Sequence, residues 1–227
     1  MKRNIAILLI SAVCFAQKGT SEDVRFDYKV RNDYFAGFTG DKEAMERALA
    51  KTGAVLATDP DHAEALVWHG SGLFYQSGQA FQTGNQQKGM ELFGKSQAMM
   101  DRAVELSPSN VGVRVPRGAV LLQATFGWPE NIAKPLIEKG LSDYLKTHEM
   151  QKDSLDTIGT HPKGELLFGI ADAYRRLGNE DKAGEWFGMI AKTMPGTNYA
   201  KRADIYLTTK TLTAGQARCV GCHESGK

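Results

Sequence analysis

The sequence feature that most constrains the fold is a pattern of apolar and small residues between positions 167 and 195. The members recur at helical spacing, and they are Leu167, Ile170, Ala171, Tyr174, Gly178, Ala183, Phe187, Ile190 and Pro195. Small side chains at Ala171 and Ala183 let two helices approach closely, while Tyr174 and Phe187 fill the space between them. The glycine suits the turn between the helices, and the proline ends the second helix. The segment therefore predicts a helix-turn-helix hairpin.

These residue types at these spacings resemble a tetratricopeptide repeat, with Leu167 at the first position, where an aromatic residue is usual. The resemblance implies a stack of similar hairpins whose concave face docks another protein. A hairpin of this kind cannot bury its apolar face alone, so further units are expected along the chain.

Three more units fit the same pattern less closely. In residues 65–108, Trp68, Gly72 and Tyr75 match the first helix, and Met100, Ala103 and Pro108 match the end of the second. The Gln- and Gly-rich stretch at 78–89 is interpreted as an expanded turn of this unit. Another unit spans 23–60, with Gly40-Asp41 opening its second helix, and another spans 111–150, with helices at 115–126 and 131–147. A closing helix is expected at 198–207.

The predicted fold class is all-α: an α-solenoid of about four tetratricopeptide-like hairpins over residues 23–207, including a C-terminal capping helix. The threonine-rich stretch at 208–218 has no amphipathic period, so it is predicted to be a linker to a flexible tail at 219–227.

The N-terminus is typical of a secretory signal peptide at residues 1–16. Met1-Lys2-Arg3 is basic, and the apolar run at 5–15 is about half the length that spans a bilayer. A small residue, Ala16, marks the expected cleavage site. The protein is therefore expected to be periplasmic or otherwise exported, with no membrane span after cleavage. Lipidation at Cys14 is an alternative, for which the preceding valine is a poor fit.

The balance of charge does not suggest a nucleic-acid partner, and none is expected. The chain has 28 basic and 26 acidic residues, and removal of the signal peptide with Lys2 and Arg3 leaves 26 of each. Nucleic-acid binding needs a clustered basic excess.

The run Cys219-Val220-Gly221-Cys222-His223 is the C-x-x-C-H pattern of covalent haem attachment. Two thiols three positions apart can each add to one vinyl group of the same porphyrin. The following imidazole then lies under the iron as the proximal ligand. The sequence therefore predicts one haem c per chain, with Cys219 and Cys222 as thioether anchors and His223 as the proximal metal ligand.

The motif also has alternative interpretations. The two thiols would also suit a small disulfide loop, a redox dithiol or a metal site. A redox pair, however, normally opens a helix within a βαβ unit. The motif also lies late in the sequence, whereas in c-type cytochromes it opens the domain. The haem is therefore expected to be covered by the repeats or by a partner chain.

The sixth iron ligand is open as well, and His161 is the preferred distal candidate. The other candidates are His62, His69, His148, Met189 and Met194. A second histidine would favour a low potential, a methionine would raise it, and an open site would bind small ligands.

Residues 89–96 match the phosphate-loop pattern G-x-x-x-x-G-K-[ST], but no strand precedes them. One apolar helical face runs through them, so this segment is interpreted as a helix that binds no nucleotide.

Two functions follow as hypotheses. The first is a periplasmic electron-transfer protein that is not an enzyme and whose repeat groove holds a protein partner, itself a redox protein. The second is a repeat scaffold or assembly factor without redox turnover. A haem enzyme or gas sensor is a third possibility and would require an open iron site.

Overall fold

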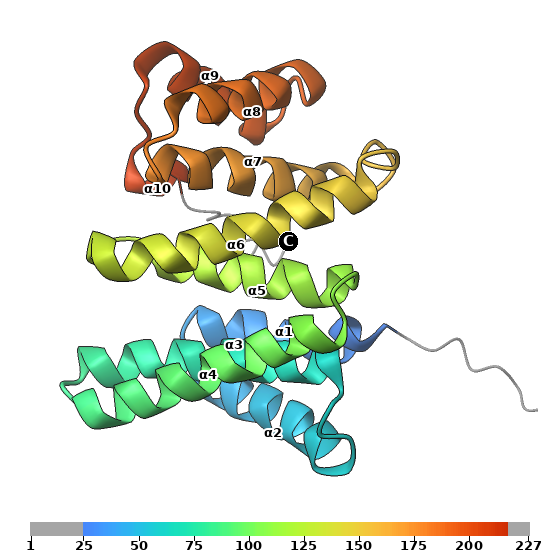
Figure 1. Cartoon of the computed structure of the whole chain (residues 1–227), viewed down its shortest axis with the longest axis vertical. Coiled ribbons are helices and arrows are strands. Elements are labelled where there is room, and N and C mark those ends of the chain that lie inside the picture. Colours follow the sequence, from blue (N-terminus) through green and yellow to red (C-terminus); the bar gives the residue numbers. More distant parts are fainter. Residues whose placement is uncertain (1–24, 218–227) are drawn as a thin grey trace, which may run out of the picture.

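The computed structural model describes residues 25–217, which are built from helices alone (Figure 1). The helices are α1 (Phe26–Phe38), α2 (Lys42–Thr58), α3 (Ala63–Gln82), α4 (Gln86–Leu106), α5 (Val111–Ala124), α6 (Glu130–Gln151), α7 (Thr160–Arg176), α8 (Glu180–Thr193), α9 (Asn198–Thr209) and the short α10 (Ala214–Ala217). Successive helices α1 to α8 pack as four hairpins stacked along one axis, and α9 covers the last hairpin. The predicted all-α class with stacked helical hairpins is confirmed.

Three of the hairpin turns use the same local chemistry. At Gly84-Asn85 the glycine has φ +82°, which closes the preceding helix at little steric cost. The Asn85 amide donates to the carbonyl of Ala80 at 2.9 Å, and its side chain accepts from the Lys88 amide at 3.1 Å. The pairs Gly40-Asp41 and Gly178-Asn179 make the equivalent bonds. One glycine thus ends a helix, and one polar cap begins the next.

The prediction of a loop at residues 78–89 is wrong. The turn is only residues 83–85, and the additional residues lengthen α3 to 20 and α4 to 21 residues. One of the glycines that suggested a loop, Gly89, has a packing role. The ring of Phe81 lies where a Cβ on Gly89 would be. Tertiary contact here outweighs the roughly 1 kcal/mol helix penalty of a glycine.

The repeat length varies along the stack. The first helices of successive units begin at residues 26, 63, 111, 160 and 198, so the repeats are 37, 48, 49 and 38 residues long. Only the first and last units approach the 34 residues of a tetratricopeptide repeat. The long middle units reflect helices of 20 to 22 residues.

In the third unit, the start of its first helix and the end of its second helix also differ from the expected residues. Helix α5 begins at Val111 rather than 115, because the Asn110 side chain caps it. Helix α6 runs to Gln151 rather than 147. The expected linker at 208–218 is partly helical, since Thr208 and Thr209 belong to α9 and Ala214–Ala217 form α10.

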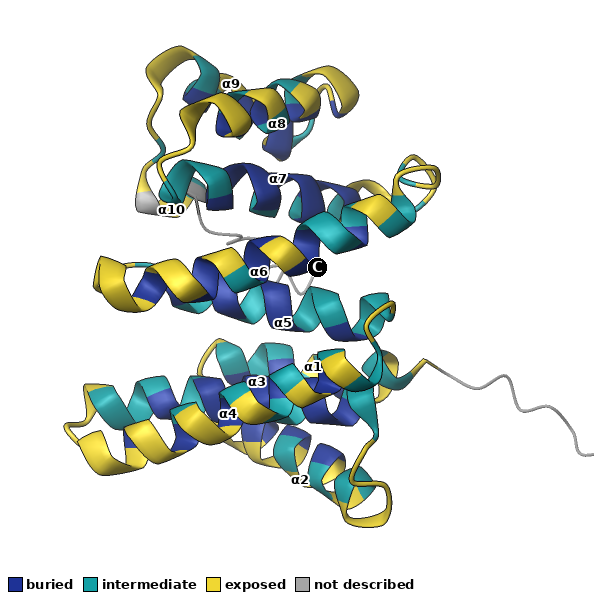
Figure 2. Cartoon of the chain, in the orientation of Figure 1, coloured by how far each residue is buried: buried dark blue, intermediate teal, exposed yellow. Residues whose placement is uncertain are grey.

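The core is a line of overlapping apolar clusters rather than one centre. One cluster joins α1 to α6, the next joins α5 to α7, and the last joins α7 to α9. Buried residues therefore face the neighbouring helices along the whole stack, and exposed residues follow the outer edges (Figure 2). In the last cluster the ring of Tyr206 lies 4.3 Å from that of Phe187, and both side chains are buried. The capping role expected of the closing helix is confirmed.

Candidate functional site

The residues that the sequence singles out for haem lie outside the described part of the chain. Cys219, Cys222 and His223 follow residue 217, and the expected signal peptide at 1–16 precedes residue 25. Within residues 25–217, no helix has both the length and the apolar character to cross a membrane. In the same range, no group of three metal-binding side chains is gathered.

The preferred distal candidate, His161, lies in the first turn of α7 and contacts two neighbours. Its Nδ1 lies 3.0 Å from the hydroxyl of Tyr199 on α9, and its Nε2 lies 3.7 Å from the Glu165 carboxylate one turn along α7. The imidazole is 43% exposed, so it is reachable from solvent. Iron binding through Nε2 would replace the contact with Glu165.

The other candidate ligands are dispersed over the stack. Nδ1 of His62 caps α3, and Nδ1 of His69 lies 2.9 Å from the Thr52 hydroxyl. The ring of His148 meets Trp186 edge-on at 4.8 Å between centroids. Met194 is buried, whereas Met189 is exposed on α8. The described fold does not bring these side chains together.

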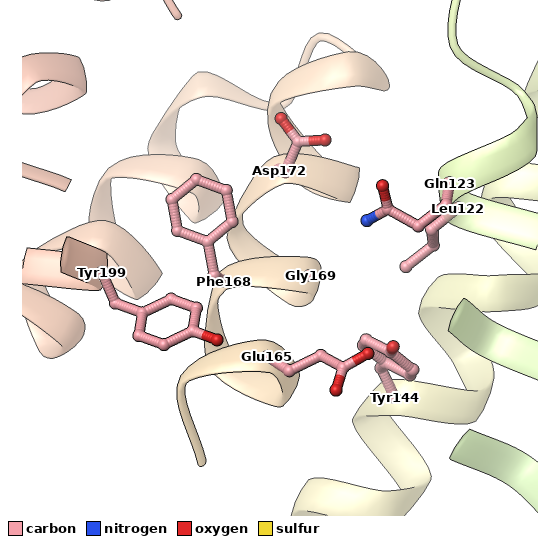
Figure 3. A pocket seen from close by; sticks show the side chains of 8 residues that line it. All are labelled: Leu122, Gln123, Tyr144, Glu165, Phe168, Gly169, Asp172 and Tyr199. Atoms are coloured by element: carbon pink, nitrogen blue, oxygen red, sulfur yellow. The ribbon is translucent and has the colours of Figure 1, made fainter. Parts of the chain in front are cut away.

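A shallow groove crosses the faces of α5, α6, α7 and α9, and Figure 3 shows the side chains that line it. They are Leu122, Gln123, Tyr144, Glu165, Phe168, Gly169, Asp172 and Tyr199. Its enclosed volume is about 10 Å³, room for a single water molecule. The groove is therefore too small to enclose a small ligand.

The groove carries two carboxylates, Glu165 and Asp172, two turns apart on α7. Burial raises the pKa of Glu165, which the nearby His161 opposes. Burial also raises the pKa of Asp172, against the opposite effect of Arg175, whose Nη2 lies 2.7 Å away. The guanidinium of Arg202 stacks 3.8 Å from the Phe168 ring in the same region. The groove thus combines aromatic rings with partly desolvated charges of both signs.

The phosphate-loop pattern at 89–96 lies inside α4. The Ser96 hydroxyl donates to the carbonyl of Phe93 at 2.7 Å, and Leu92 is buried in the hairpin. No strand leads into this segment, and its backbone amides are bonded within the helix. The interpretation of residues 89–96 as a helix is confirmed.

A second cavity lies at the end of the third and fourth hairpins. The α5–α6 turn and the first half of α6 form one wall, and the C-terminal end of α7 forms the other. Its lining residues are Thr125, Phe126, Gly127, Trp128, Glu130, Ala133, Lys134, Ile137, Arg175, Arg176 and Leu177. The volume is about 310 Å³, at the lower end of the range for ligand pockets.

Arg176 links the two walls of this cavity. Its Nη1 donates to the Leu122 carbonyl at 2.6 Å and its Nη2 to the Thr125 hydroxyl at 2.7 Å. The guanidinium also lies 4.2 Å above the ring of Phe126. Burial lowers the pKa of Arg176 and Arg175 adds to this, while Asp172 opposes it. The two hydrogen bonds of the Arg176 guanidinium thus go to neutral acceptors, while the Asp172 carboxylate stabilises its charge from a longer distance.

The other charged groups of the cavity are more exposed. Lys134 projects from α6 and makes no ion pair within residues 25–217, while Arg175 is bound to Asp172. Glu130, in the first turn of α6, is the one carboxylate of the lining. Three cations and one carboxylate therefore border a cavity with apolar walls.

No protein-family model matches this chain, and no curated protein matches it.

No sequence pattern connects residues 125–137 with residues 175–177, so the larger cavity is not predictable from the sequence. Two features of the sequence belong to this cavity, but nothing in the sequence connects them with each other. Gly127-Trp128-Pro129 breaks the helical pattern, and Arg175-Arg176 ends α7 with paired charges.

Proposed function

We propose that this chain is an exported c-type haem protein that transfers electrons, with its helical hairpins as a tetratricopeptide-like docking scaffold. The observation that carries the proposal is the run from Cys219 to His223 in the sequence that follows a capped helical array. The basic and apolar N-terminus supports export to an oxidising compartment, where covalent haem attachment takes place.

The chemistry follows from the three residues. Cys219 and Cys222 would hold the haem through two thioethers, each formed by addition of a thiol S–H across one vinyl double bond, and His223 would supply an imidazole nitrogen to the iron. The haem would supply an iron that can cycle between the ferric and ferrous states, which is the chemistry of one-electron transfer.

The hairpin array supplies the partner surface in this proposal. The shallow groove is too small for a small-molecule substrate, but the exposed Gln123 and the half-buried Glu165 offer polar groups to a protein surface. A redox protein with basic side chains would complement the Glu165 carboxylate, which is 30% exposed.

The first experiment is expression of the chain with its signal peptide in a bacterium that matures c-type cytochromes. A haem-staining band that survives a denaturing gel is expected, and it should disappear in Cys219→Ala and Cys222→Ala. His223→Ala should retain covalent haem and alter the absorption spectrum. Absence of covalent haem, where a control cytochrome matures normally, would exclude the electron-transfer proposal.

A repeat scaffold without redox turnover is the second candidate function, favoured by the groove on α7 and α9. Truncation of the C-terminal tail distinguishes the two candidate functions, and the structure indicates where the chain should be cut. Leu212 packs against the last apolar cluster, so the chain should be cut after Ala217 rather than at 208.

Loss of electron exchange with a soluble c-type cytochrome, at unchanged thermal stability, is expected of the truncated chain if it is a carrier. The matched control is the full-length double variant Cys219→Ala with Cys222→Ala. A partner captured equally well by the intact and truncated chains, with no covalent haem in the intact chain, would instead identify a scaffold.

A further inference from the structure

The cavity between the α5–α6 turn and the end of α7 combines apolar walls with charged side chains in its lining. The apolar part of the lining consists of Phe126, Trp128, Ala133, Ile137 and Leu177. The ring of Trp128 is stacked on that of Phe74, with 5.7 Å between the centroids and 9° between the planes, so this wall is fixed in place. A ligand with an apolar body would bury that body against such a wall.

The guanidinium of Arg176 is already positioned at this cavity. Its bonds to the Leu122 carbonyl and the Thr125 hydroxyl, together with the Phe126 ring 4.2 Å away, fix its orientation. The other N–H groups of this guanidinium make no hydrogen bond within residues 25–217. A cation that is held in place before binding loses little conformational entropy when it contacts an anion.

The charges around the cavity leave a single positive excess. Arg175 is bound to Asp172 at 2.7 Å, and the charge of Asp172 also stabilises the Arg176 cation. Glu130 belongs to the lining, and Lys134 makes no ion pair within residues 25–217. Three cations therefore stand against two carboxylates, and this balance favours a ligand with one negative charge.

The size of the cavity and the geometry of its cation limit the ligand further. The volume of about 310 Å³ equals that of about ten water molecules, so the ligand has a similar number of non-hydrogen atoms. A carboxylate is planar and accepts parallel hydrogen bonds from a guanidinium. A phosphate monoester carries more negative charge than the single positive excess would balance.

We propose that this cavity binds a small organic carboxylate with an aromatic body, and that Arg176 and Lys134 contact the carboxylate. The side chains of Trp128 and Ile137 cover the aromatic body. This inference goes beyond the proposed electron-transfer function and does not depend on it, because every residue of the site lies within residues 25–217 and no haem is required.

Isothermal titration calorimetry of the full-length chain with phenylacetate tests the proposal, and it reads binding whether or not haem is attached. Phenylacetate is expected to bind at one site. Phenylacetamide has nearly the same shape without the charge, and it should bind about tenfold more weakly. Acetate, which lacks the ring, should give no measurable binding, because the apolar walls would then contribute nothing.

Charge variants locate the site. Lys134→Glu is expected to weaken the binding of phenylacetate about tenfold, and Glu130→Gln is expected to strengthen it. The matched controls are Lys42→Glu and Glu43→Gln, which make the same changes in the exposed first turn of α2 and should leave the affinity unchanged.

Arg176→Gln should abolish the binding of phenylacetate. Because Arg176 also bonds to Leu122 and Thr125, far-ultraviolet circular dichroism must first show that this variant keeps its fold. If it does not fold, the exposed Lys134→Glu and Glu130→Gln variants still decide the question.

Three results would overturn the inference. Absence of phenylacetate binding up to the solubility limit would exclude the cavity as a site for such acids. Equal affinities for phenylacetate and phenylacetamide would exclude recognition of the carboxylate. Equal effects of the charge changes on α6 and α2 would show that only the net charge of the protein matters. None of these results would bear on covalent haem, which the denaturing gel tests separately.

Discussion

The guanidinium of Arg117 on α5 forms a bidentate ion pair with the fully buried carboxylate of Asp143 on α6. Nε lies 2.6 Å from Oδ2 and Nη2 lies 2.8 Å from Oδ1, while Arg114 adds a third bond at 2.7 Å. Arg117 also reaches Asp101 on α4 at 2.8 Å, so charged groups join α4, α5 and α6. Two hairpins of the stack therefore meet through a buried ionic cluster as well as through apolar side chains.

Removal of the buried carboxylate should be strongly destabilising. Asp143→Ala leaves the charges of Arg114 and Arg117 without their buried partner, so a loss of about 3–5 kcal/mol in the free energy of unfolding is expected. Urea denaturation measures it. The control is Lys139→Ala, which removes a partly exposed ion pair with Asp101 and should cost less than about 1 kcal/mol. Equal losses in both variants would contradict the structural role of Asp143.

A methyl group at Gly169 should be destabilising because the ring of Tyr144 occupies its place. The same ring also lies where a Cβ on Gly118 would be, so it is held between α5 and α7 and cannot easily move. Gly169→Ala is expected to lower the free energy of unfolding by about 1–3 kcal/mol. Gly188→Ala on α8 has open space and should instead stabilise by about 0.5–1 kcal/mol. Calorimetric melting of both variants checks the difference in sign.

The position of the turn between α3 and α4, at residues 83–85, can be tested by substitution. Asn85→Ala removes the cap on the Lys88 amide and should cost about 1 kcal/mol, and Gly84→Ala should cost a similar amount because φ is +82°. Gln87→Ala, at an exposed position of the same turn of helix, should change stability by less than about 0.5 kcal/mol. If residues 78–89 formed a loop, all three variants would have equal stability in chemical denaturation.

The contribution of His69 to stability should fall as the pH is lowered below neutrality. Burial lowers the pKa of His69 below 6.5, and Lys95 adds to this. Between pH 6.5 and the native pKa, the unfolded chain binds a proton that the native chain does not, so the free energy of unfolding decreases as pH falls. One such group changes it by at most about 1.4 kcal/mol per pH unit.

His69→Gln should therefore have a shallower dependence on pH between 7 and 5 than the unsubstituted protein. Burial lowers the pKa of His148 as well, so part of the dependence should remain. Chemical denaturation at several pH values measures both slopes. Parallel curves for the two proteins would show that His69 does not contribute.

Local patterns were sufficient for most of the helical hairpins. The small residues Ala171 and Ala183 and the core residue Phe187 are all fully buried, as their spacing predicts, because helix periodicity is a property of neighbouring residues. The same reasoning failed at 78–89, where Gln and Gly suggest a loop. The pair Gly84-Asn85 repeats Gly40-Asp41, and that comparison would have located the turn.

The sequence by itself determined the hairpins, their caps and the C-x-x-C-H motif, because each depends on residues within a few turns of one another. Only the tertiary structure decided that Lys134 and Arg176 border one cavity and that Arg117 meets Asp143. These groups are 26 or more positions apart, and small changes in helix length, such as those in α3 to α6, would alter which side chains meet. Local propensities do not set those crossings, because the packing between whole helices selects them.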